Sequence, residues 1–151
     1  SKMAEKKISQ LTAKGSNLEE TDLFIISKSD GSGGYDTKYL SGAELKSFTV
    51  NTQTDHYTFV LTDANKLVEF NHSGTKTFSL PLSGTANFPI GTEIKLAQKG
   101  TGQLRIAALA GTGAQSLLSS GGKTKIAAQY GVATLIKRST DEWYLYGDLT
   151  T

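Results

Sequence analysis

The sequence contains no cysteine, only two prolines and two histidines, and no long apolar run. Without cysteine the chain can form no disulfide, no thiolate zinc site and no thiol nucleophile, and two histidines are too few for a histidine-rich metal site. No stretch approaches the roughly eighteen apolar residues of a membrane span. We therefore expect a fold held by its hydrophobic core, with no metal, no cofactor and no membrane insertion.

A strong charge of either sign is also lacking. Lys and Arg number 16, Asp and Glu number 14, and the net charge is +2. Because nucleic-acid binding normally requires clustered positive charge, we expect no nucleic-acid partner. The N-terminal lysines are not followed by the apolar stretch of a signal peptide, which predicts synthesis and folding in the cytoplasm.

Glycine is abundant, with 16 residues, and it stands with Ser, Thr and Asn between short apolar segments. This pattern is typical of short strands joined by tight turns. We expect a mainly β fold, in which an antiparallel sandwich or jelly-roll-like module of about eight strands follows a small β-β-α unit. The predicted strands of the module are 57–61, 66–70, 77–80, 93–98, 103–108, 115–118, 132–138 and 142–147.

Three segments are predicted along the chain. Residues 1–48 should form an attachment segment with a polar arm, a hairpin (strands 22–28 and 35–40) and a short helix. Ser41 and Glu44 have the spacing of a capping box at the start of that helix. Residues 49–55 are predicted to be a linker, and residues 56–151 the distal β module. Because the first segment is too small to bury its own core, we expect it to dock on a partner.

The predicted last strand carries aromatic residues on both faces. Trp143 and Leu145 alternate with Tyr144 and Tyr146, so one of the two pairs must lie outside the core. Exposed tyrosines can be ordinary surface residues, or they can contact a subunit or ligand. The candidate contact residues are Phe24, Ile25, Ile26, Tyr130, Tyr144 and Tyr146.

Each candidate catalytic or metal-binding motif in the sequence lacks a required residue or spacing. Residues 121–124 (Gly-Gly-Lys-Thr) end like a phosphate-binding loop, but position 117 is leucine where that motif needs glycine. Asp55-His56 is accompanied by no nucleophile elbow. The glycine-rich loop between Asp30 and Asp36 lacks the ligand spacing of an EF-hand. We therefore expect no enzymatic activity and assign no catalytic, cofactor-binding or metal-binding residue.

A saccharide platform is the alternative explanation for the exposed tyrosines. Tyrosine rings contact the CH groups of sugars, while amides and carboxylates bind the hydroxyl groups. Tyr130, Tyr144 and Tyr146 have Gln129, Asp141 and Asp148 as sequence neighbours. The alternative function is therefore a monomeric, lectin-like carbohydrate-binding domain.

Several stretches of the sequence resemble bacteriophage structural proteins. Residues 8–11 (ISQL), 21–26 (TDLFII) and 37–45 (TKYLSGAEL) resemble the N-terminal segment of tail-fibre and virion-appendage proteins. Residues 57–68, 88–94, 100–104, 129–137 and 143–149 resemble a β-rich module of the same broad group.

This resemblance implies a structural component of the virion, such as a head fibre, a tail fibre or a capsid decoration protein. It further implies a homotrimer that is attached to other virion proteins through residues 1–48. The distal module would contact neighbouring virion proteins or the host surface, including its glycans. The expected location is thus the virion, after synthesis in the host cytoplasm.

Overall fold

The computed structural model describes residues 23–29, 35–41 and 49–151 of the chain. It divides into two compact units, residues 1–47 and 48–151. In the first unit, β1 (Leu23–Ser29) and β2 (Tyr35–Ser41) pair antiparallel, from Leu23 opposite Ser41 to Ser29 opposite Tyr35. These two strands overlap the predicted strands 22–28 and 35–40. The predicted helix after Ser41 lies outside the described residues.

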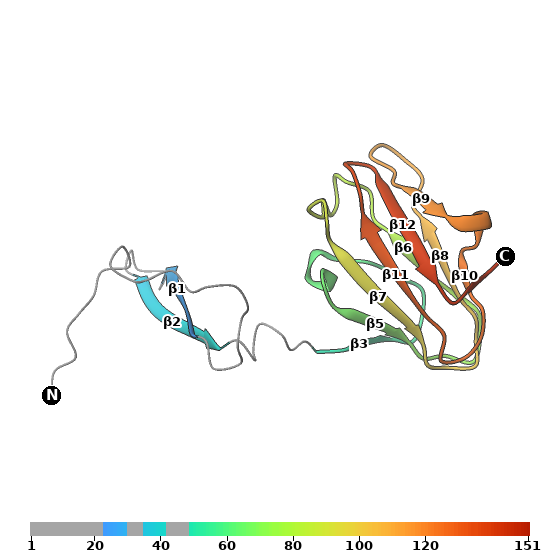
Figure 1. Cartoon of the computed structure of the whole chain (residues 1–151), viewed down its shortest axis with the longest axis horizontal. Coiled ribbons are helices and arrows are strands. Elements are labelled where there is room, and N and C mark those ends of the chain that lie inside the picture. The colour runs from blue at the N-terminus through green and yellow to red at the C-terminus, as the bar shows by residue number, and fades with distance from the viewer. Residues whose placement is uncertain (1–22, 30–34, 42–48) are drawn as a thin grey trace, which may run out of the picture. The chain divides into compact units, whose positions relative to one another are not determined.

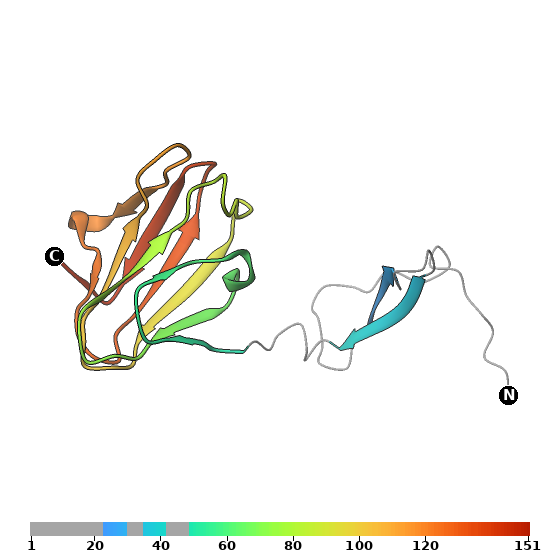
Figure 2. The ribbon, with the colours of Figure 1, turned by 180° about the vertical axis from the view of Figure 1, so that it is seen from behind.

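The second unit consists of two packed sheets, which confirms the mainly β prediction. The six-stranded sheet has the order β3-β5-β7-β11-β12-β9, and the five-stranded sheet has the order β13-β10-β8-β6-β4. Figure 1 shows the six-stranded sheet toward the viewer, and Figure 2 shows the same unit from behind. The strands are β3 (Asn51–Gln53), β4 (Tyr57–Thr58), β5 (Leu67–Phe70), β6 (Lys76–Leu80), β7 (Glu93–Gln98), β8 (Leu104–Ala108), β9 (Ser116–Ser119), β10 (Lys125–Ile126), β11 (Val132–Lys137), β12 (Glu142–Gly147) and β13 (Leu149–Thr150).

The sheets are mixed, not antiparallel as predicted. From β3 to β8 the chain changes sheet at every strand, so β3, β5 and β7 are parallel neighbours in one sheet, as are β4, β6 and β8 in the other. Antiparallel pairs appear only later in this unit, at β7-β11, β11-β12, β8-β10 and β10-β13. The prediction was wrong because a tight turn signals that the chain reverses, but it does not show which sheet receives the next strand.

Glycines allow two turns of this unit to pack closely on each other. The turn after β7 packs on the turn after β5, where the Gly102 N–H donates to the His72 carbonyl at 2.8 Å. A Cβ atom on Gly102 would lie 2.1 Å from the Gly74 carbonyl oxygen, and one on Gly100 would lie 2.4 Å from that of His72. Only a residue without a side chain fits at these two positions.

The segment 49–55, predicted to be a linker, contains β3. This strand pairs parallel with β5, from Asn51 opposite Val68 to Gln53 opposite Phe70. The sequence did not indicate β3 because its residues are polar. It is an edge strand whose side chains are at most partly buried. The predicted strand 57–61 is also shorter than expected, since β4 ends at Thr58 and a 3-10 turn, η2, covers Leu61–Asp63.

A buried carboxylate holds β3, β4 and η2 together. Asp63 is 2% exposed. It accepts hydrogen bonds from Asn51 Nδ2 (2.9 Å), the Tyr57 hydroxyl (2.9 Å) and the Val60 N–H (2.8 Å). Because three donors compensate for the lost hydration of the carboxylate, the burial of Asp63 is tolerated.

The Tyr57 hydroxyl should make stability sensitive to alkaline pH. Burial, followed by the hydrogen bond to Asp63, raises the pKa of Tyr57 above its ordinary value of 10.0. The folded state therefore retains this proton longer than the unfolded state, and the contribution of Tyr57 is lost as pH rises through the folded-state pKa. Urea unfolding at pH 8 to 11 should show a steeper alkaline loss of stability in the wild type than in Tyr57→Phe. Parallel curves would contradict this assignment.

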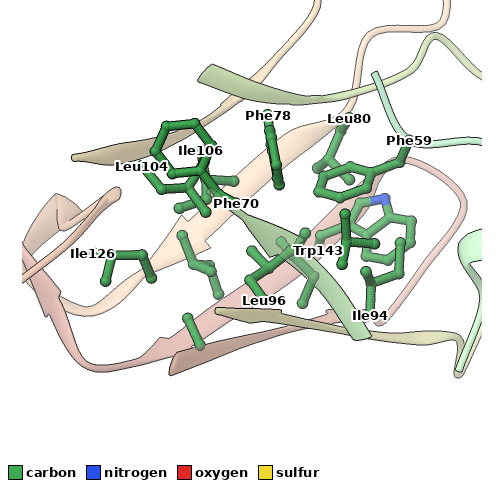
Figure 3. Packing of buried hydrophobic residues seen from close by; sticks show 14 of the residues in the cluster. Phe59, Phe70, Phe78, Leu80, Ile94, Leu96, Leu104, Ile106, Ile126 and Trp143 are labelled. Carbon is green, nitrogen blue, oxygen red and sulfur yellow. The ribbon is translucent and has the colours of Figure 1, made fainter. Parts of the chain in front are cut away.

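The core fills the space between the sheets with aliphatic and aromatic side chains (Figure 3). The alternation predicted for β7 is confirmed, because Ile94 and Leu96 are fully buried while Lys95 points outward. Phe78 packs edge-on against Phe59 and Phe70, with ring centroids 5.9 and 5.7 Å apart. The buried hydrophobic residues are Phe59, Val68, Phe70, Phe78, Leu80, Phe88, Ile94, Leu96, Leu104, Ile106, Ile126, Ala133, Leu135, Trp143 and Leu145.

Candidate functional site

The outer face of the six-stranded sheet carries two tyrosines from β12. Trp143 and Leu145 are 1% and 2% exposed, whereas Tyr144 and Tyr146 are 48% and 52% exposed. The alternation of β12 thus places one aromatic residue in the core and two outside it, as predicted. These two tyrosines form the centre of the candidate site.

An apolar groove of about 550 Å³ lies beside the tyrosines. The strand register places Tyr144 between Ile136 of β11 and Leu118 of β9. The groove walls are thus provided by three neighbouring strands at one edge of the sheet. The lining residues are Leu117, Leu118, Ser119, Ser120, Ile136, Tyr144, Leu145 and Tyr146. We call this set the apolar groove.

Charged side chains near the groove are paired with one another. Arg138 forms an ion pair with Glu142, and its guanidinium lies 5.8 Å from the centre of the Tyr144 ring. This cation–π contact holds one face of the Tyr144 ring at the rim. Farther along the same sheet face, the Lys95 ammonium lies 3.9 Å from the Glu93 carboxylate. The groove therefore combines apolar walls with a locally neutralised border.

The groove rests on a tightly packed floor. The Trp143 indole N–H donates to Gln115 Oε1 at 3.1 Å, and its ring packs edge-on against Phe88 at 5.5 Å. The Lys137 ammonium is buried and donates to the Phe88 carbonyl (2.8 Å) and to Asn87 Oδ1 (3.0 Å). Burial lowers the pKa of Lys137. These contacts join the loop before β7 to β11 and β12, and so fix the strands that carry the groove.

The structure brings together only some of the predicted contact residues. Tyr144 and Tyr146 line the groove, while Tyr130 is 74% exposed and is not among the groove residues. Phe24, Ile25 and Ile26 lie on β1, and their side chains fall outside the described part of the structure. Sequence reasoning did not identify Leu117, Leu118 and Ile136 as site residues. The alternation of β11 could have placed Ile136 outward, but the pairing of β9 with β12 had no sequence signal.

The Gln129 amide and the Asp148 carboxylate near these tyrosines have structural partners in the protein. Gln129 Nε2 donates to the Lys99 carbonyl at 3.0 Å, and Asp148 Oδ2 accepts from the Val132 N–H at 3.1 Å. The backbone carbonyl of Asp141 accepts from the Ser116 N–H. The walls of the groove are therefore mainly apolar, with the hydroxyl groups of two serines and two tyrosines as its polar groups.

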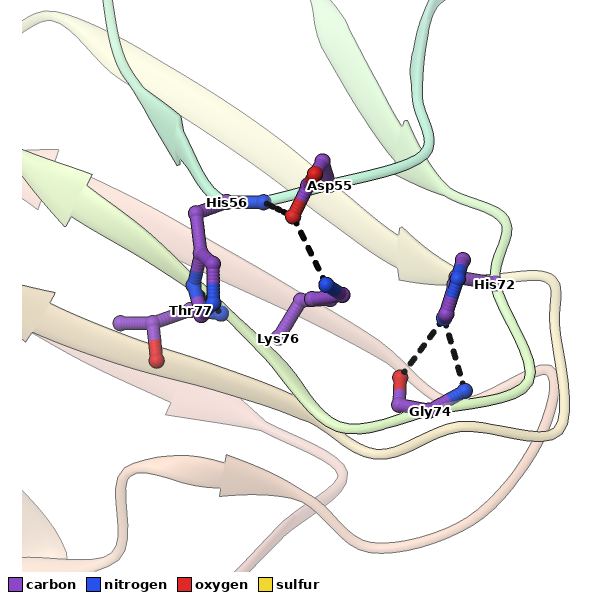
Figure 4. Close-up of polar contacts among 6 residues, drawn as sticks. All are labelled: Asp55, His56, His72, Gly74, Lys76 and Thr77. Carbon is purple, nitrogen blue, oxygen red and sulfur yellow. Dashed lines mark hydrogen bonds and ion pairs between the residues drawn. The ribbon is translucent and has the colours of Figure 1, made fainter.

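The two histidines hold turns in place (Figure 4). Asp55 contacts the ammonium of Lys76 and accepts from the backbone N–H of His56. The hydrogen bond from Lys76, followed by that from His56, holds the pKa of Asp55 below its ordinary value. The His56 ring accepts from the Thr77 N–H through Nδ1 at 3.1 Å. Asp55 thus does not orient the imidazole as the acid of a catalytic triad does. His72 Nδ1 accepts from the Gly74 N–H at 2.8 Å.

Within residues 23–29, 35–41 and 49–151, no three His, Cys, Asp or Glu side chains group to hold a metal ion. The same part of the chain contains no helix of the length and hydrophobicity needed to cross a membrane. Comparison with protein-family models, curated proteins and solved structures gives no match.

Proposed function

We propose that this protein is a non-enzymatic structural component of a bacteriophage virion appendage, and that its apolar groove is a contact between subunits. The observation that carries the proposal is the pair of half-exposed tyrosines beside the groove. The resemblance of residues 8–48 to appendage proteins supplies the setting. In this proposal, residues 1–48 attach the protein to other virion components and the β module forms the distal part.

The chemistry of the groove favours a protein partner over a sugar. Tyrosine is enriched at protein interfaces, and the core of such an interface is depleted in charge. The walls formed by Leu117, Leu118 and Ile136 match this pattern, and the bordering charges of Arg138 and Glu142 pair with each other. A sugar site would combine the tyrosine rings with amides or carboxylates that bind the sugar hydroxyl groups, whereas the polar groups among the groove residues are only serine and tyrosine hydroxyls.

The free energies of burial and association indicate that the whole groove must be buried in the subunit contact. Full burial of a large apolar side chain contributes roughly 1.5 to 3 kcal/mol, so each half-exposed tyrosine contributes about 1 kcal/mol. Association costs about 4 to 15 kcal/mol in lost freedom. Tyr144 and Tyr146 alone are insufficient, whereas the tyrosines and groove walls of several subunits together can exceed this cost. A homotrimer, in which each subunit contributes one such surface, is the assembly we propose.

An aspartate at position 144 should dissociate the assembly. Tyr144→Asp removes the ring and places a charge in the groove, where its burial at an interface is costly. Sedimentation equilibrium of the full chain should show a shift toward the monomer mass, with an unchanged β signal in circular dichroism. Arg105→Asp, at an exposed position on the outer face of β8, is the matched control and should keep the wild-type mass. An unchanged mass for Tyr144→Asp would refute the groove as the contact.

A further inference from the structure

The strands of the five-stranded sheet contain basic residues but no acidic ones. Lys76, Arg105 and Lys125 lie on β6, β8 and β10, while none of β4, β6, β8, β10 and β13 contains Asp or Glu. The six-stranded sheet, by contrast, has glutamates on β5, β7 and β12. The five-stranded sheet is therefore the more positive of the two.

Two of these cations lie directly opposite each other, Arg105 on β8 and Lys125 on β10. Paired residues of neighbouring strands point to the same face of a sheet. The residues next to them in their strands, Leu104, Ile106 and Ile126, are buried in the core, so both cations lie on the outer face. Like charges in directly opposite positions repel each other and lower the stability of the strand pair. The fold nevertheless keeps two cations side by side on this face.

Hydrogen-bonding residues extend this pair into a row across the sheet. Thr77 of β6 lies opposite Arg105, and Thr150 of β13 lies opposite Lys125. At the end beyond Thr77, the exposed His56 ring accepts from the Thr77 N–H through Nδ1 (Figure 4). The neutral ring therefore has its hydrogen on Nε2, as a further donor. We call Thr150, Lys125, Arg105, Thr77 and His56 the cationic row.

The carboxylates next to the cationic row lie at its two ends. Asp55 precedes the row at His56 and pairs with Lys76. Asp148 precedes β13 at the other end, and its Oδ2 accepts from the Val132 N–H. Within residues 49–151, no carboxylate forms an ion pair with either of the two central cations. The centre of the row is thus positive, with room for a carboxylate from outside the described module.

The outer face of the five-stranded sheet has no aromatic side chain. The aromatic residues of its strands, Tyr57 and Phe78, pack in or against the core. A nucleic acid needs cations that follow its phosphates, and a single strand also needs aromatic rings for base stacking. An anionic membrane surface is normally recognised by a cluster of about four to eight basic residues. Closely spaced cations flanked by neutral donors instead suit the carboxylates of an acidic protein segment.

From the two adjacent cations, the flanking donors and the absence of aromatic residues on this face, we propose that the cationic row binds an acidic segment of a partner protein, rich in Asp or Glu. The Arg105 guanidinium binds a carboxylate through two parallel hydrogen bonds, and the Lys125 ammonium binds a neighbouring one. Binding also offsets the repulsion between the two cations. The inference goes beyond the proposed function, because the apolar groove lies on the other sheet and shares no residue with the row.

Calorimetric titration of the full chain with a Glu-Ser repeat peptide tests this proposal. The wild type should bind this peptide and should not bind the corresponding Gln-Ser peptide. Arg105→Gln and Lys125→Gln should each weaken binding roughly tenfold, because each loses a charge-assisted hydrogen bond to a carboxylate. Lys95→Gln removes the same charge from the outer face of the other sheet and should bind as the wild type does. Circular dichroism spectra equal to that of the wild type show that the variants fold.

Several results would overturn the inference. If the wild type does not bind the Glu-Ser peptide, or if Arg105→Gln binds it equally well, the row does not hold carboxylates. An equal loss in Lys95→Gln would show that only the net charge of the protein matters. Tighter binding of oligothymidylate or of alginate with the same number of charges would assign the face to a nucleic acid or to an acidic polysaccharide.

The same titration separates this inference from the proposed function. Tyr144→Asp changes the apolar groove on the other sheet, so it should still bind the Glu-Ser peptide. If a trimeric wild type does not bind the peptide, the inference fails and the proposed function stands. If the wild type is a monomer that binds the peptide, the proposed subunit contact fails and the inference stands.

Discussion

Replacing Trp143 by alanine should lower the free energy of unfolding by about 3 to 5 kcal/mol. The indole is 1% exposed and is the largest of the fully buried side chains. Its removal leaves a cavity beneath β12, takes away the edge-on partner of Phe88 and frees Gln115 from its hydrogen bond. The surrounding sheet can close only part of that space, so both lost packing and the cavity contribute.

Urea unfolding followed by circular dichroism measures this loss for Trp143→Ala. Trp143→Phe is the matched control, because it keeps most of the apolar volume and should cost clearly less than alanine. A loss below about 1 kcal/mol for alanine would mean that Trp143 is not a core residue. The floor of the groove would then have to be placed elsewhere.

Replacing Asp63 by alanine should lower the free energy of unfolding by about 3 kcal/mol, which makes it the largest expected effect of a polar substitution here. Three donors, from Asn51, Tyr57 and Val60, would lose their shared acceptor at once. Each hydrogen bond to a charged group contributes about 1.5 to 3 kcal/mol, and part of that is recovered when water enters the site. The structure should be weakened most at the two sheet edges formed by β3 and β4.

Asp63→Asn tests whether the charge or only the shape of the side chain matters. The amide keeps one acceptor oxygen and the same volume, so we expect about half the loss measured for alanine. In Asp63→Ala, amide hydrogen exchange should be faster than in the wild type in β3 and η2, and less affected in β7 and β11. Equal stability of Asp63→Ala and the wild type would contradict the network.

Local elements of the fold could be predicted because side-chain alternation is a local property. The bounds of β7 and β12 agree with the predicted strands 93–98 and 142–147. The outward direction of Tyr144 followed from the apolar character of Trp143 and Leu145 on the other face. Wherever one face of a strand is clearly apolar, the sequence determines which side chains point to the core.

The winding of the chain could not be predicted in the same way. The residues of β5 and β6 indicate two strands and a turn, but the same residues are compatible with a hairpin in one sheet or with a passage between two sheets. β3 has polar, half-exposed side chains, so it resembled a linker. β10 and β13 are two-residue strands with too few residues to show any periodicity.

The candidate site was predictable only in its tyrosines. The groove requires Leu118 of β9 to lie beside Tyr144 of β12. This parallel pairing joins two strands that are separated in the sequence by η3, β10 and β11. The positive φ of Tyr130 could not be predicted either, because tyrosine is not a residue that signals such a turn. Long-range pairing and backbone conformation, not side-chain pattern, define these features.

The mass of the full chain in solution tests the central proposal most directly. Sedimentation velocity or light scattering of the wild type should give three times the chain mass of 16.1 kDa at micromolar concentrations. In the proposed assembly, the apolar groove is the surface that becomes buried. A wild-type protein that keeps the mass of a single chain at high micromolar concentration would contradict the account, and the same tyrosines would then be better explained by saccharide binding.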